Sequence, residues 1–186
     1  MERDFFIAEV KVGHKVDNFS AEALLPNGEF GTISLEDSLN AGKWVIVFFW
    51  PLDFTFVCPT EILAISDAYS ELQKDDVVVF GVSTDSKFSH LAWTKTPQAE
   101  GGIGKINFPM LEDTNHTISE QFGVLDEKVG ISLRGTFIIS PKGILESSVI
   151  NNLNVGRSID ELQRTLAAFQ SGGLCPVNWN KGENTL

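Results

Sequence analysis

The chain has 186 residues, of which 42% are apolar, and it carries a formal net charge of −11. This length suits one domain with a sizeable core, and no apolar run is long enough for a transmembrane helix. The negative charge excludes a nucleic-acid surface, because it would repel the phosphates. The charged start of the chain, Met1 to Asp4, lacks the features of a secretory signal. We therefore expect a cytoplasmic protein that binds neither nucleic acid nor membrane.

The first part of the chain predicts mainly extended structure. Asn27-Gly28, a dipeptide favoured in tight hairpin turns, separates two candidate strands. The expected elements are two short strand-like pieces, two hairpin strands and a short helix, over 5–7, 10–12, 19–24, 30–35 and 35–41. The hairpin would be an N-terminal extension ahead of the main sheet.

Two near-continuous apolar runs predict buried strands over 44–50 and 77–83, because strands of parallel sheets are buried on both faces. A helix-period pattern over 59–74 lies between them. We therefore expect a βαβ unit with parallel strands and a right-handed crossover. Two further helices and a short extended piece are expected over 86–95, 117–122 and 108–111.

The last third of the chain predicts a strand over 134–139, a returning strand over 144–150 and a helix over 158–169 that opens with a capping box. This order of elements is typical of an α/β protein with a thioredoxin-like fold, here with an N-terminal β-hairpin extension and a C-terminal tail. We assign residues 1–170 to the domain and 171–186 to the tail.

Cys58 lies between an apolar strand and a helix, directly before Pro59. Proline is favoured at the first helical position, so Cys58 is expected at the helix start. Free N–H groups and the helix dipole favour an anion there, which shifts a thiol toward the reactive thiolate. The residues therefore indicate a nucleophilic cysteine, with an inert core cysteine as the alternative.

Cys58 has no partner in a Cys-x-x-Cys pair, since Glu61 occupies the fourth position. This disfavours a thiol–disulfide oxidoreductase of the thioredoxin type, which stays an alternative. The second cysteine, Cys175, lies far away in the tail. The two cysteines and three histidines lack the close ligand pairs of a zinc site. No histidine stands in a motif that would make it a base, so the thiols are either inert or a redox couple.

The stretch over 49–61 resembles the active-site signature of the peroxiredoxins, with Pro51, Thr55 and Cys58 in the spacing Pro-x-x-x-Thr-x-x-Cys. It is most similar to typical two-cysteine peroxiredoxins of the bacterial alkyl hydroperoxide reductase, peroxidase-subunit type. Further matching stretches lie at 85–93, 134–139, 155–161 and 175–176. The resemblance implies a thiol-specific peroxidase for hydrogen peroxide and organic hydroperoxides, in antioxidant defence and redox homeostasis, with no metal or other cofactor.

The resemblance also implies roles for individual residues. Cys58 would be the peroxidatic cysteine, which attacks the hydroperoxide and becomes a sulfenic acid. Arg134 would favour the thiolate and hold the peroxide oxygens. Thr55 would orient thiolate and peroxide through its hydroxyl, and Pro51 would shield the site from water.

Two further pairs of residues follow from the same resemblance. Glu61 and Arg157 would be a supporting pair that fixes the geometry around the catalytic arginine, although Glu61 could also be a plain first-turn acid favoured by the helix dipole. Phe54 and Phe88 are expected either in the core or at a contact between dimers.

Cys175 would be the resolving cysteine, which attacks the sulfenic acid of the partner subunit and forms an intersubunit disulfide. This requires a homodimer, for which the family implies a ring of five dimers, and it requires the first helical turn to unwind. The segment over 101–104 only approximates the Gly-Gly-Leu-Gly motif, and the tail lacks a Tyr-Phe-bearing helix, so we predict resistance to over-oxidation. The reductant would be a dithiol: thioredoxin, a flavoprotein reductase or a small dithiol partner. A chaperone holdase is the non-enzymatic alternative.

Overall fold

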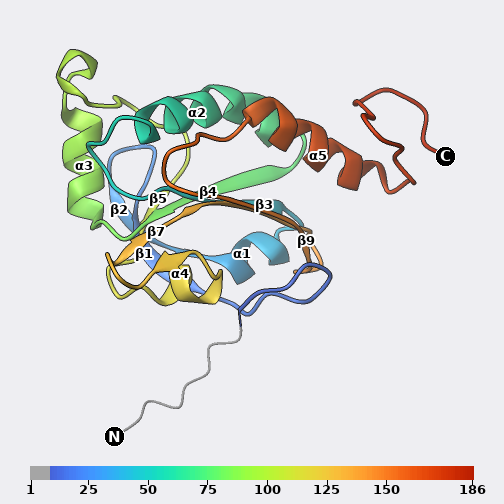
Figure 1. Cartoon of the computed structure of the whole chain (residues 1–186), viewed down its shortest axis with the longest axis horizontal. Coiled ribbons are helices and arrows are strands. Elements are labelled where there is room, and N and C mark those ends of the chain that lie inside the picture. Colours follow the sequence, from blue (N-terminus) through green and yellow to red (C-terminus); the bar gives the residue numbers. More distant parts are fainter. Residues whose placement is uncertain (1–8) are drawn as a thin grey trace, which may run out of the picture.

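A sheet of seven strands runs through the centre of the computed structural model, which describes residues 9–186 (Figure 1). The strands are β1 (Ser20–Leu24), β2 (Phe30–Ser34), β3 (Trp44–Phe49), β4 (Val77–Ser83), β5 (Met110–Glu112), β8 (Arg134–Ile139) and β9 (Leu145–Asn151). A separate pair consists of β6 (Leu125–Asp126) and β7 (Ile131–Ser132). The helices are α1 (Leu35–Asn40), α2 (Cys58–Lys74), α3 (Lys87–Lys95), the 3-10 turn η1 (Gln98–Glu100), α4 (Thr117–Gln121) and α5 (Ile159–Ser171).

The strand order is β2-β1-β5-β4-β3-β8-β9. The three central neighbours β5, β4 and β3 are parallel, whereas β8 is antiparallel to β3 and β9 is antiparallel to β8. The expected βαβ unit of β3, α2 and β4 is therefore confirmed. So is the antiparallel pair β8–β9 at the edge of the sheet.

Helices cover both faces of the sheet: α2 and α5 lie on one side, and α1 and α4 lie on the other (Figure 1). Side chains of β3 serve both layers because successive residues of a strand point to opposite faces. Ile46 and Phe48 join the apolar cluster that includes α2 and α5, whereas Val45 and Val47 join the cluster that includes α1 and α4. Both faces of β3 are thus buried, as its apolar run predicts.

The structure differs from the sequence-based expectations mainly at short elements. The strand-like piece over 5–7 lies outside the described residues. The piece over 10–12 is not a strand, although the Val10 N–H donates to the Gln121 carbonyl. The pair β6–β7 was not expected, because two-residue strands carry no periodic pattern. Helix α2 begins at Cys58, one residue before the predicted start. Among residues 9–186, no helix has the length and apolar character needed to cross a membrane.

Candidate active site

Cys58 is the first residue of α2, at the end of the loop that leaves β3. Its side chain is 0% exposed. Pro59 follows in the first turn, as the sequence predicts, and the residue before the helix, Val57, provides no side-chain cap. The first turn therefore brings the positive end of the helix dipole close to the thiol.

Arg134 brings a positive charge directly to this thiol. It is the first residue of β8 and is almost completely buried. One guanidinium nitrogen, Nη1, lies 3.4 Å from Cys58 Sγ and donates to Glu61 Oε2 at 2.7 Å. Its Nε donates to the Leu153 carbonyl at 2.7 Å, which fixes the plane of the group. The antiparallel pairing of β8 with β3 thus delivers the arginine to the start of α2.

Glu61 and Arg157 lie behind Arg134. Glu61 is in the first turn of α2, and Arg157 is in the segment before α5. Arg157 donates to Glu61 through its backbone N–H at 2.7 Å, its Nε at 2.9 Å and its Nη2 at 3.0 Å. The guanidinium also stacks on the Phe48 ring, with Cζ 3.5 Å from the ring centroid. Glu61 therefore receives bonds from both Arg134 and Arg157, which locks all three side chains together.

The electrostatics of this group follow from burial and pairing. Burial acts to raise the pKa of Glu61, but the hydrogen bonds and charge of Arg157, together with the charge of Arg134, outweigh it and lower that pKa. Burial lowers the pKa of Arg157, opposed by Glu61. With Glu61 ionised, two guanidinium groups face one carboxylate, so one positive charge is left over. Such a buried excess charge favours an anion next to it.

The other two predicted site residues lie in the loop before the helix. Pro51 is buried directly after β3. The Thr55 hydroxyl is half-buried and donates to the Leu52 carbonyl at 3.0 Å. No hydrogen bond joins Thr55 to Cys58 among the described residues, so in this state the hydroxyl holds the loop. Its oxygen lone pairs remain able to accept a bond.

Cys175 is not brought to Cys58 within one chain, and both cysteines are free thiols. Cys175 Sγ lies 3.3 Å from Ser171 Oγ, just beyond the end of α5. The tail folds against its own subunit: the Arg164 side chain donates to the Trp179 carbonyl at 3.0 Å, and Lys181 forms an ion pair with Asp75. The tail that carries the Cys175 thiol thus continues from the C-terminal end of α5 (Figure 1).

A buried carboxylate–histidine pair, between Asp53 of the same loop and His90 of α3, was missed by the sequence analysis. Asp53 Oδ2 lies 2.8 Å from His90 Nδ1, and both side chains are buried. The two residues lie 37 positions apart, so no local motif could reveal the contact. The one available signal was that both stretches, 49–61 and 85–93, belong to the segments that carry the family resemblance. No cluster of metal-ligating side chains occurs among residues 9–186.

Comparisons with known proteins show the family and the fold of the chain. Residues 12–148 match the model of the AhpC/TSA family. A peroxiredoxin of Cynops pyrrhogaster is 48% identical over 182 residues, which cover 96% of this chain and 90% of that protein. The crystal structure of the reduced 2-Cys peroxiredoxin of Plasmodium vivax superposes with a TM-score of 0.90 at 42% identity, covering 94% of this chain and 91% of the other. The crystal structure of Enterococcus faecalis AhpC superposes with a TM-score of 0.82 at 41% identity, covering 90% of this chain and 99% of the other.

Proposed function

The chain belongs to the AhpC/TSA family and is a thiol-dependent peroxidase of antioxidant defence with a thioredoxin-like fold, and from this premise we propose how its residues divide the reaction. The single observation that carries the assignment is the contact of Arg134 with the buried Cys58 thiol at 3.4 Å. No second cysteine lies beside Cys58 in the described chain, so a thiol–disulfide oxidoreductase is not favoured. The holdase alternative is not favoured either.

In the first step the Cys58 thiolate attacks the terminal oxygen of a hydroperoxide. The sulfur–oxygen bond forms as the oxygen–oxygen bond breaks, and the leaving alkoxide or hydroxide takes a proton to become an alcohol or water. Cys58 is oxidised to sulfenic acid and the peroxide is reduced. Arg134 stabilises the thiolate and the charge that moves onto the departing oxygen. Thr55 exchanges its bond with the Leu52 carbonyl for one with the peroxide.

Pro51, Glu61 and Arg157 support this step from around the reacting atoms. Pro51 closes the wall of the site toward β3 and limits the access of water. Glu61 and Arg157 hold the Arg134 guanidinium at the sulfur, since the Glu61 carboxylate bonds to both arginines. The pair therefore acts through Arg134 and does not touch the substrate.

In the second step the Cys175 thiol of a partner subunit attacks the sulfenic acid sulfur. A disulfide forms and the sulfenic oxygen leaves as water, which balances the step. Because the Cys58 side chain is 0% exposed, it cannot meet a second thiol until the first turn of α2 opens. An external dithiol then reduces the disulfide and regenerates both thiols; thioredoxin, a flavoprotein reductase and a small dithiol protein all have the required chemistry.

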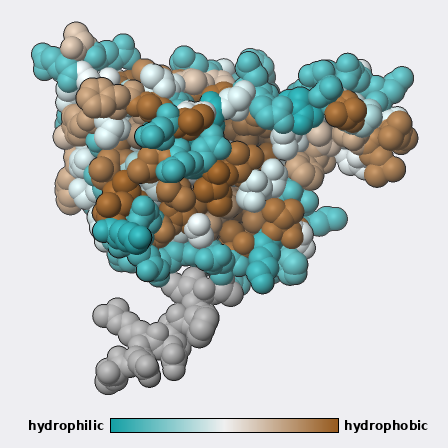
Figure 2. All heavy atoms as spheres, viewed as in Figure 1, coloured by the Kyte–Doolittle hydropathy of each residue, from teal (hydrophilic) through white to brown (hydrophobic). Residues whose placement is uncertain are grey.

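A homodimer formed through β9 supports this exchange. β9 is the last strand of the sheet, and its exposed residues include Val149 and Ile150. Figure 2 shows hydrophobic residues gathered across the middle of the visible face. An apolar edge strand is a ready template for pairing with a second chain. We propose dimers of this kind, assembled further into a ring of five, in the cytoplasm.

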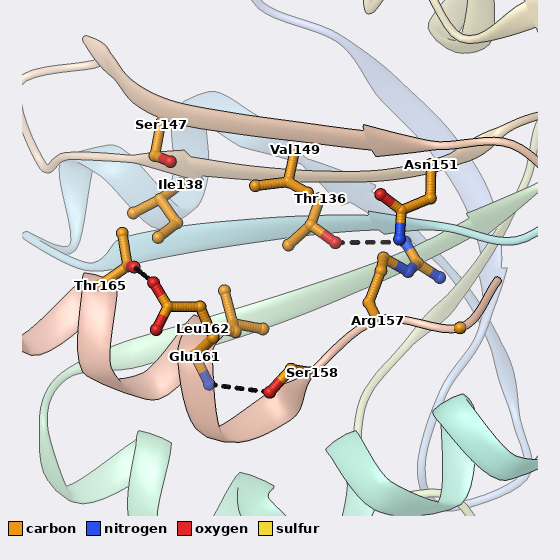
Figure 3. Close-up of a pocket in the computed structure, with 11 residues that line it drawn as sticks. Thr136, Ile138, Ser147, Val149, Asn151, Arg157, Ser158, Glu161, Leu162 and Thr165 are labelled. Carbon is orange, nitrogen blue, oxygen red and sulfur yellow. Dashed lines mark hydrogen bonds between the residues drawn. The ribbon is translucent and has the colours of Figure 1, made fainter. Parts of the chain in front are cut away.

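A pocket beside β9 offers a place for the partner's tail. Its volume is about 230 Å³, and it lies between the β8–β9 hairpin and α5 (Figure 3). Arg157 lines it together with Thr136, to whose hydroxyl it donates at 3.2 Å. Since Arg157 also contacts Glu61, the pocket adjoins the peroxide site. In this assignment residues 1–170 form the peroxidase domain and 171–186 the tail, which leaves its contacts with its own subunit to reach the neighbouring one.

The assignment is tested by peroxide consumption with dithiothreitol as the reductant. Wild-type protein is expected to consume hydrogen peroxide and cumene hydroperoxide catalytically. Cys58→Ser should lose this activity, whereas Cys175→Ser should keep it, because a small dithiol can reduce the sulfenic acid directly. Full activity in Cys58→Ser would contradict the assignment.

A further inference from the structure

Asp53 is the most heavily bonded side chain of the loop that carries Cys58. Its carboxylate is 1% exposed and accepts hydrogen bonds from Trp50 Nε1 at 2.9 Å and from Ser89 Oγ at 2.8 Å. His90 Nδ1 lies 2.8 Å from the same carboxylate. The Asp53 backbone N–H donates to Asp85 Oδ2, also at 2.8 Å. The loop is therefore fixed at Asp53 through both its side chain and its backbone.

His90 connects this anchor to two elements of the fold. It belongs to α3, its side chain is 0% exposed, and its Nε2 lies 3.2 Å from the Leu111 carbonyl on β5. Both ring nitrogens thus face oxygen acceptors, whereas a neutral imidazole carries only one N–H. The pair is therefore a buried hydrogen-bonded tie from the loop to α3 and β5.

Further charged groups lie on the elements around the pair. Burial and the charge of Asp53 raise the pKa of Asp85, while the Asp53 N–H, Ser83 and His90 act to lower it. On β5, Glu112 accepts from the Lys87 backbone N–H. The Lys87 ammonium in turn pairs with Glu22, away from the tie.

The residue directly after Asp53 is held in an unfavourable backbone conformation. Phe54 has φ 56°, in the left-handed region that side chains with a Cβ disfavour. Its ring is 50% exposed and meets Trp93 with centroids 5.9 Å apart. Such a turn persists only where neighbouring contacts hold it. The Asp53 contacts are the buried ones, and Cys58 follows only four residues later.

We propose that Asp53 and His90 position Cys58 by clamping the loop over 51–57 in the closed state that attacks peroxide. The clamp opposes the opening that disulfide formation needs, so it sets the balance between the two steps. Neither residue bonds to Cys58 among the described residues, so they are positioning residues. The inference rests on the proposed roles of Cys58 and Cys175.

The test measures two rate constants in single turnovers by rapid quench and mass spectrometry: sulfenic acid formation with hydrogen peroxide, and the subsequent loss of sulfenic acid to disulfide. The variants are His90→Asn and Asp53→Asn, with Ser89→Ala as a milder change that keeps the pair. Asp113→Asn is the matched control. Asp113 is a buried carboxylate that accepts from the N–H groups of Ile118 and Ser119 at the start of α4.

We expect His90→Asn and Asp53→Asn to slow sulfenic acid formation by about tenfold or more, as misplacement of a reacting group does. The rate constant of disulfide formation should equal that of wild-type protein or exceed it. Ser89→Ala should move the ratio of the two constants in the same direction by less. Asp113→Asn should leave the ratio unchanged even where its melting temperature falls.

An unchanged ratio in the clamp variants, or an equal shift in Asp113→Asn, would overturn the clamp. If His90→Asn does not fold, the ratio of the two rate constants in Asp53→Asn and Ser89→Ala tests the proposal in its place. Failure of the proposed function has a different signature, because wild-type protein would then form no sulfenic acid at Cys58.

Discussion

The chemistry of the site depends on a charge balance around one thiol. Arg134 and Arg157 face Glu61 in a buried group, and the positive charge that is left over lies at Cys58. A thiolate completes this balance, whereas a neutral thiol leaves it incomplete. Since the group is buried, the arginine charge is screened less than it would be at the surface.

Replacing Arg134 by lysine tests this balance. Lysine keeps a charge but cannot bond at once to Cys58, Glu61 and the Leu153 carbonyl, because its ammonium is a single point. We expect Arg134→Lys to lower the rate constant of Cys58 with hydrogen peroxide by about 100-fold, the loss seen when one preorganised donor is removed. Stopped-flow measurement checks this, and Arg164→Lys, a surface arginine paired with Glu161, is the control. Equal rates in the two variants would argue against the role of Arg134.

The Thr55 hydroxyl gives a second prediction about a single residue. If the hydroxyl orients the peroxide, Thr55→Ser should retain most of the peroxide rate and Thr55→Val should lose about 10-fold to 100-fold, as for a removed positioning group. Thr55→Ser keeps the hydroxyl and loses the methyl group, whereas Thr55→Val replaces the hydroxyl by a methyl group of similar size. A Thr55→Val enzyme as fast as Thr55→Ser would show that the hydroxyl serves only its bond to Leu52.

At the scale of elements, the start of α2 is stabilised by the same residues that serve the chemistry. Glu61 bonds to β8 through Arg134 and to the segment before α5 through Arg157. Opening the first turn of α2 must therefore disturb three elements together. A segment that has to open in the proposed second step is therefore held closed in this structure by contacts with β8 and with the segment before α5.

The lowered pKa of Glu61 predicts a pH dependence of stability. A carboxyl whose pKa is lower in the folded than in the unfolded chain adds stability above its ordinary range, and this stability is lost as the pH falls through the folded value. Urea unfolding from neutral pH down to about pH 3 should therefore show this loss in wild-type protein and not in Glu61→Gln. At neutral pH the variant should be about 3–5 kcal/mol less stable, since a buried arginine loses its partner.

Glu161→Gln is the matched control for this experiment. Arg164 lowers the pKa of Glu161 to about 2, but the pair lies at the surface, where water screens its contribution. We expect only a small change in unfolding free energy. A Glu61→Gln protein with the pH profile of wild type would contradict the account of the buried group.

Long periodic elements could be predicted from the sequence, whereas contacts between distant segments could not. The apolar runs of β3 and β4 and the pattern of α2 place Cys58 at a helix start, because each signal is local. Arg134 and Arg157 could be assigned only through the family resemblance. The Asp53–His90 pair joins residues with no shared pattern, and Phe54 adopts a left-handed conformation that nothing in its residue type indicates. His90 stands in no motif that would make it a base, so its contact with Asp53 could not be predicted from the sequence.

At the scale of the whole molecule, one chain holds an incomplete reaction cycle. Cys58 is buried beneath the first turn of α2, and Cys175 is held by the end of α5 and its own tail. The exposed edge strand β9 and the pocket beside it lie next to α5 (Figure 3). Pairing two chains at β9 would supply the second thiol from the partner.

A charge on the edge strand should prevent this pairing. We expect Val149→Lys to lower the mass seen in sedimentation to that of one chain, because a lysine on an edge blocks strand addition. Val129→Lys is the control, since Val129 is also exposed but lies outside the seven-stranded sheet. The same mass in both variants would exclude β9 as the dimer contact.

The central claim is that Cys58 of one subunit is oxidised by peroxide and resolved by Cys175 of another. Non-reducing electrophoresis after one equivalent of hydrogen peroxide tests it most directly, on wild-type protein, Cys58→Ser, Cys175→Ser and a refolded mixture of the two variants. The account predicts a disulfide-linked dimer band in wild type and in the mixture, and none in either variant alone. A band in either single variant, or its absence from both wild type and the mixture, would contradict the account.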